Sequence, residues 1–172
     1  MRMAARLQAT RKRIGGGNID AETFFNQARD AARDLDRMTK ALERMKSGEG
    51  IGGASLGPMA PHGSISDPMS KVDARLDRES IWSRQIEECQ HTIDTATAIL
   101  YGEDGRTGLA KALGNLYADT LWLRYLDSRT IKAIAILYQC SRSRVYHLTQ
   151  IALDFIDSNG FDDTMRGRNT VC

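Results

Sequence analysis

The sequence predicts an all-α protein, in which a long helical hairpin or coiled coil is followed by a C-terminal helix-turn-helix. Apolar residues recur at helical spacing along two long segments, which is the primary sequence signal for amphipathic helices. Aromatic residues make up only 6% of the 172 residues and there are three prolines, a composition that favours helices over a β-sandwich. With 41% hydrophobic residues, the chain can bury the core of one domain or of two small ones.

The first long helix is expected over residues 20–46. Asp20 and Thr23 supply N-capping chemistry at its start, and Ser47 with Gly48 supplies the stop. Its apolar residues alternate spacings of four and three, the heptad rhythm that keeps one apolar seam along a helix. The seam consists of Phe24, Ala28, Ala31, Leu35, Met38, Leu42 and Met45. Because the other faces carry Arg, Asp and Glu, this seam needs a partner.

A linker is expected at residues 47–68, which hold six glycines and all three prolines. A second helix is then predicted from about Met69 to Leu100, and its later half repeats the heptad rhythm. The second seam consists of Trp82, Ile86, Cys89, Ile93, Ala96 and Leu100. Two helices of similar length joined by a loop form either an antiparallel hairpin or a dimerising coiled coil, and both arrangements stay open for residues 20–101.

The net charge of +2 is unevenly distributed along the chain. Residues 1–19 carry five basic groups and no acid, and we expect them to form a flexible tail. Residues 20–127 carry 13 basic and 18 acidic groups. Residues 128–153 contain four basic groups and neither Asp nor Glu. Such an asymmetry indicates a polyanionic partner for the acid-free segment.

The cysteine and histidine patterns give no indication of a metal, a cofactor or an enzyme. Cys89, Cys140 and Cys172 lack CxxC spacing, whereas a zinc site needs about four ligands at short spacings. The sequence contains no phosphate-binding glycine loop and no nucleophile-elbow motif. No apolar run approaches the roughly 20 residues of a membrane span, and the N-terminus lacks the apolar stretch of a signal peptide. We therefore expect a soluble, cytoplasmic non-enzyme with no membrane partner.

Residues 109–157 are predicted to form a helix-turn-helix DNA-binding domain. Its first helix is expected to run unbroken over residues 109–125. Thr130 then caps a brief helix that Tyr138 closes. The expected apolar face of this brief helix consists of Ile131, Ile134, Ala135 and Leu137.

Ser141 caps a third helix that runs to about Asp157, and a flexible tail is expected at 158–172. Helices of a helix-turn-helix cross at a steep angle, so a small residue is needed at the crossing, and Ala135 is placed for that role. Four apolar residues of the third helix are predicted to face the core: Val145, Leu148, Ala152 and Ile156.

The opposite face of the third helix carries residue types that contact DNA. A major groove admits one helix, and side chains near its N-terminus reach the base edges first. The residues expected to contact phosphates are Arg129, Lys132, Arg142 and Arg144. The residues expected to face bases are Ser143, Tyr146, His147 and Gln150.

Residues 113–156 resemble region four of bacterial sigma factors. The motifs that carry the resemblance are Arg124-Tyr125, Thr130, Ile134-Ala135, Ser141-Arg142-Ser143-Arg144-Val145 and Ala152-Leu153. The whole layout is similar to small phage and prophage regulators of the late-gene or autolysin-regulator (ArpU-like) type. In the sigma family the start of the recognition helix reads the −35 promoter element, which here implicates Arg142, Ser143, Tyr146 and His147. Ser143 replaces a frequent Glu and Tyr146 a frequent Arg, so the target is not assumed to be a −35 element.

The resemblance and the charge pattern together predict a sequence-specific DNA-binding transcriptional regulator of phage or prophage origin. Double-stranded DNA is the expected partner, and RNA polymerase and a second copy of the chain are further candidate partners through the helical region. Two alternatives stay open. The chain could be a phage terminase small subunit, or a helical adaptor that binds protein rather than DNA.

Overall fold

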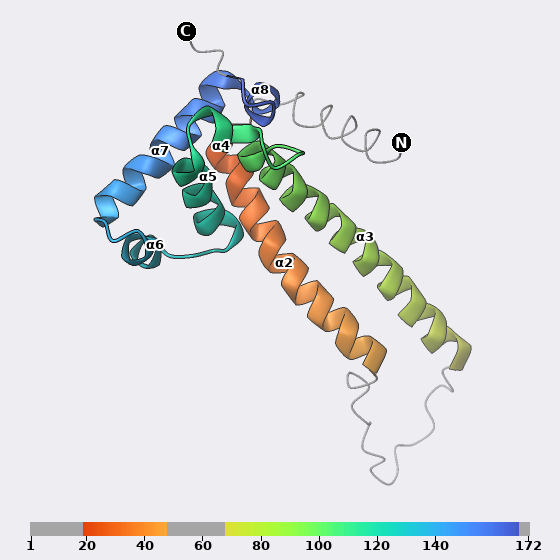
Figure 1. The fold of residues 1–172 in the computed structure, drawn as a ribbon. Helices are drawn as coiled ribbons and strands as arrows, with labels where there is room; N and C mark the ends of the chain where they lie inside the picture. The colour runs from red at the N-terminus through yellow and green to blue at the C-terminus, as the bar shows by residue number, and fades with distance from the viewer. Residues whose placement is uncertain (1–18, 48–67, 169–172) are drawn as a thin grey trace. The chain divides into compact units, whose positions relative to one another are not determined.

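The computed structural model describes residues 19–47 and 68–168, and every regular element within these ranges is a helix (Figure 1). The all-α class is therefore confirmed. The elements are α2 (Ala21–Ser47), α3 (Pro68–Tyr101), α4 (Gly108–Ala112), α5 (Asn115–Leu121), the π-helix η1 (Trp122–Leu126), α6 (Ile131–Leu137), α7 (Arg142–Asn159) and α8 (Phe161–Met165). Residues 1–18 of the expected basic tail and residues 48–67 of the expected linker lie outside the described residues.

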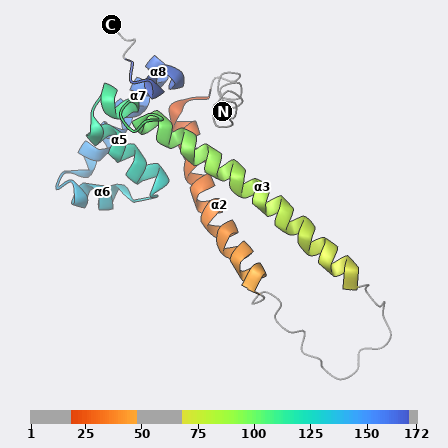
Figure 2. The ribbon, with the colours of Figure 1, turned by 45° about the vertical axis from the view of Figure 1, so that its right-hand side comes forward.

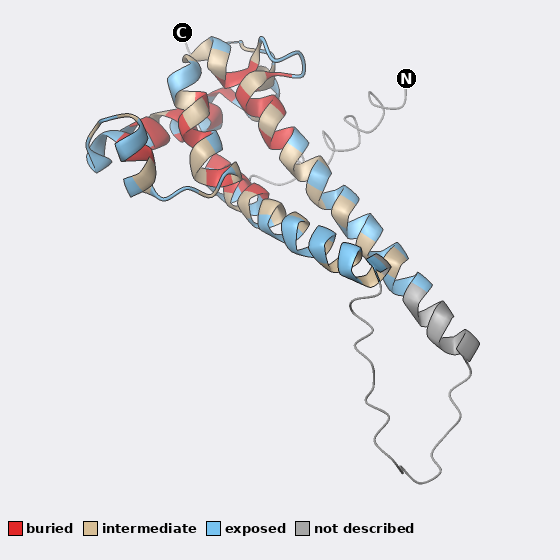
Figure 3. Cartoon of the chain, turned by 60° about the horizontal axis from the view of Figure 1, so that its bottom comes forward, coloured by how far each residue is buried: buried red, intermediate tan, exposed pale blue. Residues whose placement is uncertain are grey.

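The chain divides into two compact units, and both long helices pass from one unit to the other. The first unit comprises the residues up to Arg29 and those from Asp94 onward, and the second comprises Asp30–Ile93. The first unit therefore includes the first turns of α2, the last turns of α3 and all the shorter helices. In Figure 3 the buried residues gather in these parts of the chain, whereas the described remainder of α2 and α3 is exposed or intermediate.

The core of the first unit joins segments that lie far apart in the sequence. Phe24 and Phe25 are buried at the start of α2, and the Phe25 ring lies 5.6 Å from the ring of Tyr125. The Phe24 ring lies 5.2 Å from the ring of Phe161 in α8. The remaining buried members of this core are Ala21, Ala28, Ala96, Ile99, Leu100, Leu109, Ala118, Leu121, Ala152, Leu153 and Ile156. Burying this apolar surface is the main term that holds these segments together.

Two hydrogen bonds hold the start of α2. The sequence predicts the first of them but not the second. The Asp20 carboxylate accepts a hydrogen bond of 2.6 Å from the backbone N–H of Thr23, which confirms the expected N-cap. The Thr23 hydroxyl, together with this backbone bond, holds the pKa of Asp20 below its ordinary value of 3.8. The backbone N–H of Ala21 donates to Oδ1 of Asp157 at 2.6 Å, a contact across 136 residues that no local pattern indicates. The start of α2 is thus tied to the end of α7.

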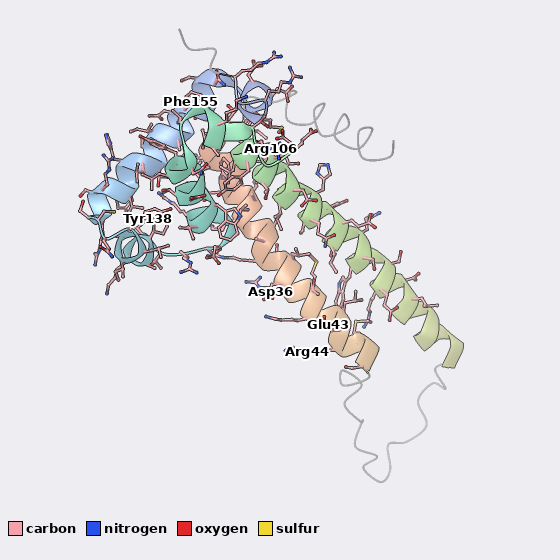
Figure 4. All side chains as sticks on the ribbon, in the orientation of Figure 1. Asp36, Glu43, Arg44, Arg106, Tyr138 and Phe155 are labelled. Carbon is pink, nitrogen blue, oxygen red and sulfur yellow. The ribbon has the colours of Figure 1, made fainter. Side chains whose placement is uncertain are left out.

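In the second unit, the two predicted seams are half-buried. The members on α2 and α3 that have intermediate exposure are Ala31, Leu35, Met38, Leu42, Met45, Trp82, Ile86, Cys89 and Ile93. Burial, with the nearby carboxylates of Asp34 and Glu88, raises the pKa of the Cys89 thiol. The outer side of α2 is charged, with Lys40 paired to Asp36 at 2.7 Å, and Asp36 is labelled in Figure 4. The choice between hairpin and coiled coil stays a prediction.

Two expectations for the C-terminal region are wrong. The predicted helix over residues 109–125 is broken, because Gly114 adopts a φ of 110° between α4 and α5. A flexible tail was expected at residues 158–172, but α7 continues to Asn159 and α8 follows directly, and residues 169–172 lie outside the described residues. Thr164 of α8 is fully buried, and Asn159 donates a hydrogen bond of 2.6 Å to the carbonyl of Arg168.

A tight loop that contains Gly102, Gly105 and Gly108 joins α3 to α4. Gly108 has a φ of 71°, and a Cβ built there would lie 2.5 Å from the backbone nitrogen of Gly102. Only glycine fits such a close approach of two backbone segments. At the end of α3, just before this loop, the Tyr101 hydroxyl donates a hydrogen bond of 2.5 Å to Asp119 of α5. Burial together with this bond raises the pKa of Tyr101.

Candidate nucleic-acid interface

The α6–α7 pair, residues 130–159, contains most of the predicted DNA-contacting residues, and both helices begin at the expected caps. The Thr130 hydroxyl accepts a hydrogen bond of 3.2 Å from the N–H of Ala133. The Ser141 hydroxyl accepts one of 3.2 Å from the N–H of Arg144. Each bond satisfies one of the backbone donors that a helix start leaves unpaired. Figures 1 and 2 agree in placing α6 at the N-terminal end of α7.

The connection between α6 and α7 is a Schellman turn. The N–H of Cys140 donates to the carbonyl of Ala135 at 2.9 Å, and the N–H of Gln139 donates to that of Ile136 at 3.1 Å. Gln139 has a φ of 50°, the left-handed conformation that this motif requires and that glycine usually provides. Tyr138 ends α6, as predicted, and is labelled in Figure 4. The turn fixes the direction in which α7 leaves α6.

A small apolar cluster holds α6 against α7. Ile134 and Val145 are fully buried and Ala135 is 6% exposed. The partly buried neighbours of this cluster are Leu123, Ile131, Tyr138 and Cys140. Ala135 therefore lies in the contact between the helices, where a larger side chain would hold them apart. The prediction that Leu137 belongs to the apolar face of α6 is wrong, because its side chain is 54% exposed. Tyr138 takes its place in the cluster.

Helix α7 has one buried and one exposed side. The four residues predicted to face the core, Val145, Leu148, Ala152 and Ile156, are all at most 2% exposed. Since successive residues turn by about 100° around a helix, Ser143, His147 and Gln150 lie on the side opposite these residues. Tyr146 and Arg144 lie at the two edges of that outward side, and all five of these side chains are exposed. The sequence pattern thus predicted the exposed side of α7 correctly.

The first two turns of α7 present cations without a carboxylate. Arg142 and Arg144 are exposed at the helix start, where the helix dipole mildly disfavours positive charge. Two further predicted cations differ in their surroundings. Lys132 is exposed on α6, whereas Arg129 is ion-paired with Asp127, so an anion would have to compete with that carboxylate. At the other end of the face, Gln150 donates a hydrogen bond of 2.8 Å to Asp154.

Arg124 belongs to this surface, although the sequence did not mark it as a site residue. Its guanidinium carbon lies 5.8 Å from the ring centroid of Tyr146 and 5.3 Å from that of Tyr125. Arg124 lies in η1, where the N–H of Asp127 donates to the carbonyl of Trp122, five residues back, at 3.0 Å. The only sequence signal was the Arg124-Tyr125 motif of the resemblance, because a periodicity of 3.6 residues does not reveal a π-helix.

The described residues include no group of three or more His, Cys, Asp and Glu side chains that could hold a metal ion. None of the helices in residues 19–47 and 68–168 combines the length and the apolar character needed to cross a bilayer. Comparisons with protein-family models, curated proteins and solved structures found no match to this chain.

Proposed function

We propose that the α6–α7 pair binds double-stranded DNA and that the chain is a sequence-specific transcriptional regulator of phage or prophage origin. The observation that carries the proposal is that the exposed residues in the first three turns of α7 combine two arginines with polar side chains and include no carboxylate. At 1.5 Å per residue the 18 residues of α7 extend about 27 Å, long enough to cross a major groove.

The two kinds of side chain on this surface have different roles in the proposal. Arg142, Arg144 and Lys132 contact phosphates, which supplies affinity for any duplex. Ser143, Tyr146 and His147 face base edges and supply sequence preference. Arg129 and Gln150 join the interface only by exchanging their intramolecular partners, Asp127 and Asp154, for DNA.

A salt titration of DNA affinity tests the proposal. The double variant Arg142→Ala/Arg144→Ala should bind every duplex more weakly, and the slope of log K against log salt should fall in magnitude by about 2, because each phosphate contact contributes about 0.9. The matched control is Arg33→Ala/Arg37→Ala, which removes the same charge from exposed positions of α2. Equal slopes for the two double variants would contradict the proposal. A random-library selection with the purified protein would then identify the preferred site.

A helical adaptor is the second candidate, and one observation favours it. Ile136 and Leu137 of α6 are 68% and 54% exposed, which is unusual for adjacent large apolar residues on a protein without a partner there. No duplex binding even at low salt would favour the adaptor. A large ring in native mass spectrometry, in contrast, would favour the terminase small subunit. For a regulator we propose that RNA polymerase or a second copy of the chain binds through the helical region.

A further inference from the structure

One cation of the interface lies close to two aromatic rings. The guanidinium of Arg124 lies within cation–π reach of both Tyr125, at 5.3 Å, and Tyr146, at 5.8 Å. The first ring is a core residue, only 1% exposed, whereas the second is 56% exposed at the edge of the outward side of α7. Arg124 thus connects the core of the first unit to a residue that the proposed function assigns to base contact.

The backbone explains why Arg124 can reach Tyr146. Residues 122–126 form a π-helix, which holds one more residue per hydrogen-bonded turn than an α-helix and so changes the direction of its side chains. Tyr125 fixes this segment, because its ring packs 5.6 Å from Phe25 in the core. Arg124, the residue before this anchor, has intermediate exposure and is directed to α7. Short π-helical segments are frequent at functional sites.

We infer that Arg124 is a positioning residue for Tyr146: its guanidinium fixes the tyrosine ring in one orientation at the edge of the DNA-facing side of α7. The inference rests on the proposed DNA binding and names a determinant of its specificity. An exposed tyrosine that moves freely loses rotamer freedom when it contacts a base, and a ring that is already fixed loses less. Arg124 therefore raises the preference for the selected sequence, and it does so through Tyr146.

The first test measures the contact itself in the free protein. NMR should show the side-chain protons of Arg124 shifted upfield by the Tyr146 ring, with the shift retained in Tyr146→Phe and reduced in Tyr146→Leu. The Tyr125 ring is unchanged in both variants and serves as the internal reference. Identical Arg124 shifts in the wild type and in Tyr146→Leu would overturn the inference.

The second test is a double-mutant cycle on DNA discrimination. The measured quantity is the ratio of affinities for the selected duplex and for a scrambled duplex of the same length. Arg124→Gln should lower this ratio about two- to fivefold, the range of a cation–π contact at an exposed site. In the background of Tyr146→Leu the same change should have no further effect on the ratio. Arg124→Lys, which keeps the charge, should preserve the salt slope while losing part of the discrimination.

Two comparisons separate this inference from the proposed function. Lys132→Gln combined with Tyr146→Leu is the control cycle, and its effects should be additive because Lys132 is assigned only to phosphate contact. If Arg142→Ala/Arg144→Ala weakens DNA binding while Arg124→Gln and Tyr146→Leu act additively, only the positioning role is wrong. If the arginine pair proves neutral, the DNA interface itself is wrong, whatever the NMR shifts show.

Discussion

Replacing Gln139 with glycine should stabilise the protein, because this residue holds a backbone conformation that suits glycine better. Gln139 has a φ of 50° in the turn between α6 and α7, and its side chain is exposed. The hydrogen bonds of this turn come from backbone groups, at 2.9 and 3.1 Å, so glycine retains them. Helix-turn-helix turns often contain glycine for the same reason.

The size of the effect follows from two opposing terms. A residue with a Cβ loses roughly 1–2 kcal/mol in the left-handed conformation. Glycine avoids that penalty, but its more flexible unfolded chain costs about 0.5–1 kcal/mol on folding. The two ranges subtract to a net gain of about 0–1.5 kcal/mol for Gln139→Gly, centred on about 0.75 kcal/mol.

Urea denaturation followed by tryptophan fluorescence provides the measurement. Trp122 lies in η1, close in sequence to the α6–α7 pair, and a Trp82→Phe background removes the only other tryptophan. With an m-value of about 1–2 kcal/mol/M, the midpoint should rise by roughly 0.5 M at unchanged m.

Gln139→Ala is the control, since alanine removes the side chain but keeps the Cβ that makes this conformation unfavourable. Its midpoint should stay close to that of the wild type. A glycine variant no more stable than the alanine variant would refute the reasoning, because the strain assigned to position 139 would then contribute nothing.

Three further predictions concern stability. Gly108→Ala should destabilise the protein by more than about 2 kcal/mol in the same urea assay. The alanine Cβ would lie 2.5 Å from the backbone nitrogen of Gly102, and a backbone atom cannot move aside as the end of a flexible side chain can. Ala135→Leu should lower the free energy of unfolding by about 1–3 kcal/mol, because the larger side chain overpacks the α6–α7 contact. Ala135→Gly should lower it by less, and equal losses for the two variants would argue against a tight contact. The pKa of Asp20 is lowered in the folded protein, so its N-cap stabilises the fold fully at pH values above the ordinary pKa of 3.8. This contribution is lost as the pH falls through the pKa of Asp20 in the folded protein. Urea midpoints measured from pH 6 to pH 2.5 should consequently decline less steeply in Asp20→Asn than in the wild type, and parallel curves would contradict the assignment.

Local sequence patterns predicted the helices and caps well. Asp20, Thr130 and Ser141 all cap the helices expected of them, because capping involves neighbours within three residues. The buried side of α7 was predicted for the same reason, since a period of 3.6 residues determines which side chains share a face.

Apart from the break at Gly114, which is local, the errors occur where distant segments decide the structure. Leu137 fits the apolar pattern of α6, but Tyr138 completes the cluster and leaves Leu137 exposed. The tail from 158 lacks a long apolar repeat, yet α8 packs Phe161 against Phe24 from the other end of the chain. Arg124 was missed as a site residue because its contact with Tyr146 requires a π-helix and a neighbouring helix together.

The bond between Ala21 and Asp157 has a consequence for how the protein is made. Its two partners lie 136 residues apart, so a ribosome that adds about 5–20 residues per second completes the second partner roughly 7–27 s after the first. During that interval Phe24 and Phe25 have no completed core to enter, and their apolar surface is available to chaperones or to other nascent chains. A truncated product that ends before α7 would lack Phe161, so the surface of Phe24 that packs against this ring would stay exposed. Premature termination should therefore yield an aggregating polypeptide rather than a shortened folded protein.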